Sequence, residues 1–481
     1  MGKKIEPVLY PKYIEKEFKT RVLAFYDADV ITLENQDIHK IFDFSTLLCT
    51  TFEHQLLTFT RSIPTFPYLE QVIAAGFKPF CSEEGTPLGI RLKGARNTSR
   101  WIASATAWGF EDYLEAFHGS YQEAIVSWLA LMREAYTLGN VGTQPSPGSW
   151  GQAMFRQSFK EQYGESWRVH RHRRPPGSYA EKIRYESSGA RSEVLQLNVA
   201  FDIAYENDRK NSYGASLAEA QPTGKTYRIF SDVSDYSFYF VECEVTIHAQ
   251  LALGVFPVRV STGRVRHPVF PTQPGIYRCW LWHREITLCR EEGLHVRIIG
   301  GFAWREATYD FQPFVEKLSQ LRDSAPDPIK PLIKLALVAT VGRLGMPEEQ
   351  YTLVPWDSRE VGDRAVAEAG IAYDWWIHQE HNSYPQSMPH IFSHVLMLTR
   401  LALYQMAKRC MQEELNVIAT NTDAVITEKK PAIPLKGEQV ETGDWTALEL
   451  HHVKVTANRH LDSDEKSVHP GIPRHIFKSQ Q

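Results

Sequence analysis

The sequence has few cysteines, and their spacing excludes the sites that cysteine pairs usually form. No two of the six have the short separation of a zinc-ligand pair or of a redox-active dithiol. We therefore expect reduced thiols with a structural role. The six are Cys49, Cys81, Cys243, Cys279, Cys289 and Cys410.

Long apolar runs are also missing. No stretch is long enough to span a bilayer, and the first residues, Met1–Ile5, carry no apolar signal region, so we expect a cytoplasmic location and no membrane partner. The net charge of −4 at pH 7 argues mildly against a nucleic-acid binder. Basic residues can still gather locally, and the densest group lies between Arg168 and Arg174.

What the sequence does contain is an ordered series of strand and helix patterns in a composition typical of a globular protein. A helical pattern over 111–137 precedes a linker over 139–151 that is rich in glycine and proline. Strands, a helical insertion and strands again predict an α+β fold. The expected strands cover 194–201, 238–247, 276–288 and 295–302, and the expected helices cover 311–322, 330–344 and 391–411.

Two aspartates stand in polar breaks at the ends of apolar runs. Asp208 lies in the segment Tyr205–Gly214, and Asp423 follows the run Val417–Ala419. An isolated carboxylate is costly to bury in an apolar strand. Two carboxylates brought together at strand ends can share divalent cations and hold a triphosphate in line with a nucleophile.

Cations lie between these two aspartates in the sequence. Lys330 and Lys334 are four residues apart and share one helix face, and Arg322 precedes them. Such a face is most often simply solvated. Between two candidate metal ligands it also suits phosphate binding, and Gly342 beside Arg343 allows something flat to approach the backbone. Carboxylates for metal and cations for phosphate together indicate nucleotidyl transfer.

The segment Asp208–Tyr213 reads Asp-Arg-Lys-Asn-Ser-Tyr and resembles the palm motif Asp-x-x-Ser-Leu-Tyr of family B DNA polymerases. Within that family, the chain most resembles the protein-primed type of phages and linear plasmids. The resemblance implies that Asp208 is a metal ligand, together with the backbone carbonyl of Arg209. It also implies that Asn211 lies at the nucleotide, and that Tyr213 stacks under the sugar and excludes a 2′-hydroxyl.

The segment Lys334–Gly342 resembles the fingers helix of the same family, in which Lys and three further residues precede Asn-Ser-x-Tyr-Gly. It keeps the Lys and the Gly, but Val338 and Val341 replace the Asn and the Tyr. The positions implied to bind the incoming nucleotide are Arg322, Lys330 and Lys334, and those implied to contact DNA are Gly342 and Arg343.

The third motif of the family is Asp-Thr-Asp, and Asn421-Thr422-Asp423 looks like this turn with its first Asp replaced. The resemblance makes Asp423 the principal metal ligand. Asn421 can still accept a hydrogen bond but removes one negative charge from the site, so weaker metal binding or slower turnover is an open alternative.

Two flanking segments extend the resemblance to about residues 180–475. Ser188–Glu193 resembles the Gly-Gly-Arg linker ahead of the palm, which implies that Gly189 and Arg191 touch the template strand. Gly471–Arg474 resembles a segment that follows the primer-binding Lys-x-Tyr motif, which is itself degraded here. The nearest basic candidates for primer binding are Lys454 and Arg459, with His460 where an aromatic residue is expected.

The N-terminal part has only fragments of the family's proofreading exonuclease, which needs four carboxylates. Tyr26–Asp29 resembles the first Asp-x-Glu motif, whereas Tyr121–Ile125 has Ile125 where the last Asp belongs. We expect an inactive exonuclease-like domain in which Asp27 and Asp29 are a strand-end acidic pair.

Other residues have competing interpretations. His390 and His394 have a spacing that zinc can use, but a structural or solvent-facing role is favoured because no glutamate or nearby cysteine completes the set. Asp202 is a competitor of Asp208, and its apolar neighbours place it in mid-strand. The aromatic residues Tyr373, Trp375 and Trp376 could stack bases but more often such a run packs in a core.

The implied fold is an α+β polymerase right hand, with palm, fingers and a reduced thumb, preceded by a degenerate exonuclease-like (RNase H-like) α/β domain. The implied parts are the exonuclease-like domain over 1–160, the palm over 161–325 and 401–460, the fingers over 326–400, and a truncated thumb or tail over 461–481.

The implied function is template-directed DNA synthesis with two Mg²⁺ ions (Mn²⁺ is possible), dNTPs, and a DNA template and primer. The implied setting is replication of a phage or mobile element in the cytoplasm of a bacterium or infected host. A protein primer or a thumb-supplying partner is possible. The alternative is a polymerase-fold DNA-binding protein with weak catalysis that needs a partner, and a nuclease built on Asp27 and Asp29 is a more distant third.

Overall fold

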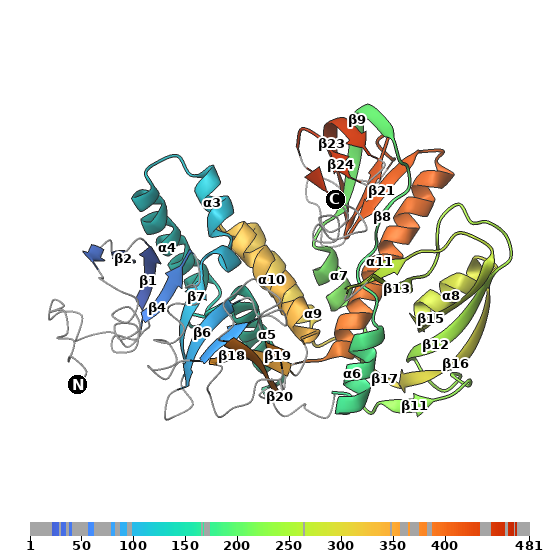
Figure 1. The fold of residues 1–481 in the computed structure, drawn as a ribbon, viewed down its shortest axis with the longest axis horizontal. Helices are drawn as coiled ribbons and strands as arrows, with labels where there is room; N and C mark the ends of the chain where they lie inside the picture. Colours follow the sequence, from blue (N-terminus) through green and yellow to red (C-terminus); the bar gives the residue numbers. More distant parts are fainter. Residues whose placement is uncertain are drawn as a thin grey trace. The chain divides into compact units, whose positions relative to one another are not determined.

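A computed structural model gives the fold of the chain, which forms two compact units that are each discontinuous in sequence (Figure 1). Unit 1 comprises Met1–Gln157, Gln320–Thr340 and Glu348–Tyr384, and unit 2 comprises Ser158–Ser319, Val341–Pro347 and Pro385–Gln481. The structure describes residues 22–27, 30–34, 38–40, 56–61, 78–81, 87–93, 99–164, 167, 174–262, 265–346, 349–355, 364–365, 375–381, 387–432, 444–456, 460–465 and 467–468.

Unit 1 is built on a mixed sheet in the order β19-β20-β18-β5-β6-β7-β4-β1-β2-β3. The pairs β1–β4 and β4–β7 are parallel, and the other pairs are antiparallel. The strands are β1 Val22–Asp27, β2 Val30–Leu33, β3 Ile38–Lys40, β4 Leu56–Thr60, β5 Lys78–Cys81, β6 Pro87–Lys93, β7 Ser99–Ser104, β18 Glu349–Pro355, β19 Arg364–Ala365 and β20 Trp375–His381.

Helices cover the β1–β4 part of this sheet, where Trp128 packs edge-on against Phe59 at 4.9 Å between ring centroids. The predicted helix over 111–137 is in fact two helices, because Ser120 caps the second through a reciprocal pair of hydrogen bonds with Glu123. The predicted linker over 139–151 ends early, since Pro147 begins a helix. The elements are η3 Thr106–Trp108, α3 Phe110–Ala116, α4 Tyr121–Leu138 and α5 Pro147–Tyr163.

Unit 2 contains a fully antiparallel sheet in the order β25-β24-β23-β9-β22-β21-β8. The long helix α11, Pro389–Gln412, is buried along most of its length and packs on β21, β22, α6 and α7 (Figure 1). The other elements are α6 Gly177–Glu186, β8 Ser192–Val194, β9 Val199–Arg209, α7 Ser212–Ala218, β21 Val417–Asn421, β22 Ala424–Thr427, β23 Trp445–Val455, β24 Leu461–Asp462 and β25 Ser467–Val468.

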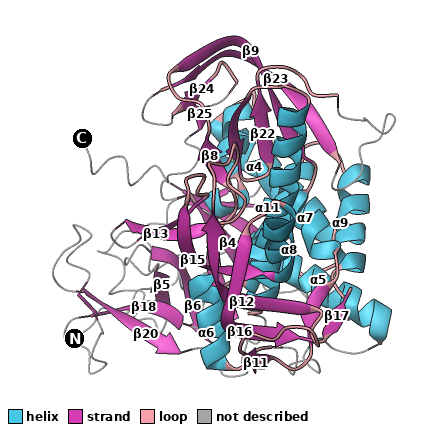
Figure 2. Ribbon diagram, turned by 90° about the vertical axis from the view of Figure 1, so that its right-hand side faces the viewer, coloured by secondary structure: helices cyan, strands magenta, loops and turns pink. Residues whose placement is uncertain are grey.

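A second antiparallel sheet of unit 2 has the order β11-β16-β12-β15, and α8 packs against β12, β15 and β16 (Figure 2). Its apolar residues share one core with α11. Two short ladders, β10–β17 and β13–β14, complete the unit. The elements are β10 Gln221–Thr223, β11 Tyr227–Ile229, β12 Phe238–Ile247, β13 Val258–Thr262, β14 Val265–Val269, β15 Gly275–Trp282, α8 His283–Glu291, β16 His295–Trp304 and β17 Glu306–Thr308.

The structure corrects two predicted strands. The strand predicted over 276–288 ends at Trp282, where Glu285 accepts a hydrogen bond from the Trp282 backbone N–H at 3.1 Å and caps α8. The strand predicted over 194–201 is divided, because Asn198 has a left-handed φ of 57° between β8 and β9. The predicted strand over 238–247 and the predicted helix over 330–344 match β12 and α10 (Lys330–Leu344).

The predicted boundaries at 160 and 325 lie near the unit boundaries at Gln157 and Ser319. The predicted boundary at residue 400 falls inside α11, an unbroken helix that lies wholly in unit 2. Helix α9, Gln312–Ser324, precedes α10. The exonuclease, palm, fingers and thumb names for these parts stay predictions.

Two further predictions concern composition. Among the residues that the structure describes, no helix is both long and apolar enough to cross a membrane. The cysteines whose thiols are described, Cys243, Cys279, Cys289 and Cys410, are buried and free.

Candidate active site

Asp208 lies near the end of β9, the strand between β22 and β23. The ladders pair it with Ala424 on one side and Thr446 on the other. Its neighbour Asn207 is completely buried, and the Asn207 side-chain amide donates to the Val425 carbonyl at 2.9 Å. This bond lies between β9 and β22, so the position of Asp208 is set by the centre of the sheet.

Asp423 lies in the two-residue turn between β21 and β22, directly before the residue that pairs with Asp208. The backbone N–H of Arg209 donates to the Asp423 carbonyl at 3.0 Å. Both aspartates therefore lie at the ends of paired strands, Asp208 on β9 and Asp423 directly before β22. Their shared use of metal ions stays a prediction.

The turn that carries Asp423 is strained. Thr422 has a φ of 59°, a left-handed conformation that costs a β-branched residue about 1–2 kcal/mol. Its N–H donates to the Arg191 carbonyl at 2.9 Å, with the Ser192 hydroxyl oxygen also within reach at 3.2 Å. Asn421 accepts a hydrogen bond from the Ser192 hydroxyl at 3.3 Å. The segment before β8 therefore holds the turn in place.

The start of α7 brings the remaining palm-motif residues to this place. Asn211 has a left-handed φ of 53°, and its side-chain amide lies against the backbone of Gly214, where an added side chain would approach it to 2.5 Å. The pKa of Tyr213 is raised to about 12, mainly by burial and also by the negative charge of Asp423, while the positive charge of Arg400 lowers it. Tyr213 is thus close enough to Asp423 to sense its charge.

The donor chemistry of this pair suits a hard divalent cation. Carboxylate oxygens are the ligands that Mg²⁺ prefers, and Mg²⁺ commonly uses one or two carboxylates together with substrate phosphates and water. Among the residues that the structure describes, no group of three or more His, Cys, Asp or Glu side chains could hold a metal ion. Asp208 and Asp423 thus supply the type of donor that a hard divalent cation prefers, and their binding of such a cation stays a prediction.

The predicted phosphate-binding cations belong to unit 1. Lys330 pairs with Asp327 at 2.7 Å, and Arg322 is half-buried in the last turn of α9. Lys334 is exposed and forms no ion pair with any residue that the structure describes. Since the aspartates belong to unit 2, the assembly of these cations with the carboxylates stays a prediction.

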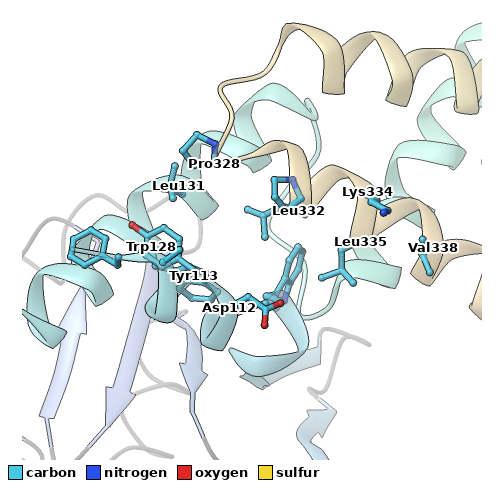
Figure 3. A pocket seen from close by; sticks show the side chains of 14 residues that line it. Asp112, Tyr113, Trp128, Leu131, Pro328, Leu332, Lys334, Leu335 and Val338 are labelled. Atoms are coloured by element: carbon cyan, nitrogen blue, oxygen red, sulfur yellow. The ribbon is translucent and has the colours of Figure 1, made fainter. Parts of the chain in front are cut away.

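Lys334 lines an apolar pocket of about 630 Å³ within unit 1 (Figure 3). Leu332, Leu335 and Val338 line it from α10, and Trp128 lines it from α4. Val338 occupies the position at which the resembled motif has Asn. Because the other residues that line the pocket are mostly apolar, an apolar side chain is accommodated there. Val341, which replaces the family's Tyr, is buried.

The predicted DNA contacts differ in accessibility. Gly189, Gly342 and Lys454 are exposed, and a side chain at either glycine would meet open space. Arg191 is only 1% exposed, and its guanidinium donates to the Gly254 carbonyl at 2.8 Å, so this geometry does not favour a DNA contact by its side chain.

Two further positions of the predicted DNA-contacting segments are only partly exposed. Arg343 is half-buried, and His460 pairs with Asp462 at 2.7 Å. The predicted residues Arg459, Asp29 and Gly471–Arg474 lie outside the described part of the chain.

In unit 1, Asp27 is engaged by protein groups. The Tyr121 hydroxyl donates a short hydrogen bond to its carboxylate, and the Arg61 guanidinium lies 5.7 Å from the centre of the Tyr121 ring. Arg61 also forms two hydrogen bonds of 2.9 Å with Glu111. Ile125, at the position of a family carboxylate, is buried in the core.

The other candidates have structural surroundings. His390 and His394 are buried on α11, where His390 stacks on Trp304 and His394 contacts the Gln221 side chain at 2.9 Å. Of the two alternatives, structural or solvent-facing, the structure supports the structural one. Asp202 is exposed on β9, six residues before Asp208.

The family model of type B DNA polymerases, organellar and viral, matches residues 127–373, more than half of the 481-residue chain. The chain belongs to this family. Its class is therefore DNA-directed DNA polymerase, which confirms the resemblance found in the sequence. The matched region contains Asp208 and the fingers-like helix and ends before Asp423. No curated protein sequence matches the chain.

Solved structures of phi29 DNA polymerase share this mixed α+β fold. The ternary complex with primer-template DNA and incoming nucleotide aligns with a TM-score of 0.69 at 13% identity, over 95% of this chain and 94% of that chain. The complex with single-stranded DNA aligns with a TM-score of 0.67 at 13% identity, over 94% and 90% of the two chains. At this identity the likeness concerns the fold alone.

Sequence reasoning missed one residue close to the site. Arg400 is a charged residue in the middle of an apolar helix, and its charge acts on Tyr213. The only signal in the sequence was a single charge within an apolar run. A buried arginine requires partners, and the local sequence does not reveal which residues these are.

Proposed function

We propose that the chain performs template-directed DNA synthesis by two-metal nucleotidyl transfer, in the replication of a phage or mobile element. The observation that carries this proposal is that Asp208 lies on β9 and Asp423 lies in the turn directly before β22, the strand that pairs with β9, in a member of the type B DNA polymerase family. The organisation into palm, fingers, reduced thumb and inactive exonuclease-like domain is part of the same proposal.

Asp208 and Asp423 would hold the two metal ions, with the Arg209 carbonyl as a further ligand. Bound there, Mg²⁺ would lower the pKa of the attacking hydroxyl and neutralise charge on the triphosphate. The primer hydroxyl gives up its proton to solvent and attacks the α-phosphorus. A new P–O bond forms, the bond from the α-phosphorus to the bridging oxygen breaks, and pyrophosphate leaves with that oxygen. Tyr213, whose pKa is influenced by the charge of Asp423, would support the sugar of the incoming nucleotide.

Lys334 and Arg322 would supply positive charge to the triphosphate, with Lys330 as a weaker contributor because Asp327 already neutralises it. The exposed Gly189, Gly342 and Lys454 would contact the DNA. The partners are dNTPs, a DNA template and primer, and either a protein primer or a thumb-supplying chain. These assignments rest on the family motifs and on the exposure of the groups.

Primer extension with Mg²⁺ or Mn²⁺ and labelled dNTPs tests the proposal. We expect Asp208→Ala and Asp423→Ala each to lower incorporation by more than about a hundredfold, because loss of even outer-sphere partners of metal sites costs 10–100-fold. Asp202→Ala is the matched control, since it removes an exposed carboxylate from the same strand and should leave incorporation unchanged. Failure of the wild type to incorporate with either metal, while it binds DNA, would contradict the proposal.

The second candidate function is a polymerase-fold DNA-binding protein with weak catalysis. Asn421 is the observation that favours it, because the described residues contain no third acidic side chain grouped with the two aspartates. In unit 1, the bonds of Asp27 to Tyr121 and of Arg61 to Glu111 support the inactive exonuclease-like domain.

A further inference from the structure

Arg400 is a buried cation with a complete set of partners. Its side chain is about 5% exposed on α11, and the guanidinium Nε and Nη2 donate to one oxygen of Glu285 at 3.0 and 2.8 Å. The remaining Nη1 donates to the carbonyls of Ser188 at 2.6 Å and Gly189 at 2.8 Å. A charge buried so deeply is tolerated only with such pairing, so the position of Ser188–Gly189 is tied to that of Arg400.

Glu285 connects Arg400 to the second sheet of unit 2. Its other carboxylate oxygen accepts the backbone N–H of Trp282 at 3.1 Å and caps α8. The Glu285 side chain is 2% exposed. One carboxylate thus joins the start of α8 to the middle of α11.

The chain segment that Arg400 holds continues directly to the candidate metal site. Arg191, three residues after Ser188, is fixed by bonds from its guanidinium to Glu193 at 2.7 Å and to the Gly254 carbonyl at 2.8 Å. Its backbone carbonyl accepts the N–H of Thr422, the strained residue before Asp423. Two sets of hydrogen bonds therefore connect Arg400 to the turn of Asp423. The first joins Arg400 to the carbonyls of Ser188 and Gly189, and the second joins Arg191 to Thr422.

We propose that Arg400 is a positioning residue for Asp423, acting through the segment Ser188–Ser192. The inference rests on the proposed function, because it concerns the metal ligands of that same site. The left-handed Thr422 is held by its bonds to Arg191 and Ser192. Without Arg400, two carbonyls lose their donors and Glu285 becomes an unpaired buried charge, so the segment shifts and Thr422 relaxes toward a less strained conformation. Asp423 then leaves the geometry that a shared cation requires.

The test is the affinity of the full-length protein for Mn²⁺, measured by electron paramagnetic resonance or calorimetry without DNA. We expect Arg400→Met to weaken binding by about 10–100-fold, the usual cost of losing an outer-sphere partner. Glu285→Gln, which removes the charge but can still accept hydrogen bonds, should weaken binding less. The matched control is Arg278→Met, which breaks the exposed ion pair with Glu242 and should bind as the wild type does.

Primer extension supplies a second readout that a merely structural role would not change. Saturating Mn²⁺ should restore the rate of Arg400→Met, whereas the metal concentration at half-maximal rate should rise. Wild-type affinity in a folded Arg400→Met protein would overturn the inference. If Arg400→Met does not fold, Glu285→Gln decides in the same way.

The two proposals fail differently. If Asp423→Ala binds Mn²⁺ as tightly as the wild type, the metal site itself is wrong and this inference falls with it. If Asp423→Ala loses binding while Arg400→Met and Glu285→Gln keep it, only the positioning role is wrong.

Discussion

At the scale of the single residue, the charge at position 421 decides between the two candidate functions. Asn421 keeps the hairpin contact that its position requires, because its side-chain oxygen accepts the Ser192 hydroxyl. An aspartate could accept the same bond and would add a negative charge next to the turn of Asp423. The asparagine is therefore compatible with the fold of the turn but leaves the candidate metal site with less charge.

We expect Asn421→Asp to lower the Mg²⁺ concentration at half-maximal primer extension by about tenfold, or about 1.4 kcal/mol. Attraction between a carboxylate and a cation a few ångströms away is worth several kcal/mol at the effective dielectric constant of a protein surface, which makes tenfold a modest expectation. A titration of extension rate with Mg²⁺ measures it. Asn198→Asp, which adds the same charge at an exposed loop, is the control. An unchanged titration would show that the site works without a third carboxylate.

At the scale of the element, two glycines at helix α10 allow the effect of packing to be compared with that of backbone entropy. A side chain at Gly151 of α5 would approach the Thr340 hydroxyl to 1.9 Å and the Ala336 carbonyl to 2.5 Å, both in α10. A side chain at Gly342, near the end of α10 itself, would meet open space. The two glycines thus differ in their surroundings, since only Gly151 lies in a contact too tight for a side chain.

Gly151→Ala should destabilise the protein by about 1–3 kcal/mol, because the added methyl group forces α5 and α10 apart. Gly342→Ala should stabilise it by about 0.5–1 kcal/mol, because glycine is a poor helix residue and nothing obstructs the methyl group. Urea unfolding of both variants measures these opposite changes. Equal effects of the two substitutions would contradict the tight contact between the helices.

The elements also show what the sequence could predict. Helix α10 was predicted at both ends because its apolar run begins and ends cleanly. The junction of β15 and α8 was missed because no glycine or proline separates them, and only the capping role of Glu285 marks it. Asp208 and Asp423 stood out as local charges in apolar runs. The Arg400–Glu285 pair joins positions 115 residues apart, so no local pattern could reveal it.

At the scale of the whole molecule, the fold resembles that of phi29 DNA polymerase at only 13% identity. A shared fold at such low identity is physically reasonable, since cores tolerate extensive substitution when volume and polarity pattern are kept. The stability of this core also depends on groups that the catalytic proposal does not use. Among them are the imidazoles of His283, His390 and His394 in unit 2, where His283 and His394 stack at 5.6 Å between ring centroids.

Because these histidines are largely buried, we predict that the free energy of unfolding of the protein decreases in mild acid. Burial lowers the pKa of His283 to about 4 and that of His390 to about 3, and it holds the pKa of His394 well below its usual value. Between pH 6.5 and 4 the unfolded chain binds protons at these positions that the folded chain does not bind, so the free energy of unfolding falls as the pH falls. The limiting slope of the free energy of unfolding is about 1.4 kcal/mol per pH unit for each histidine.

Urea unfolding at pH 7.5 and pH 5.5 should show this loss of stability. The variant His390→Phe, which keeps a ring against Trp304, should reduce the loss. His248→Gln, at an exposed position, should leave it unchanged, and an equal loss in His390→Phe and the wild type would assign the acid sensitivity to other groups.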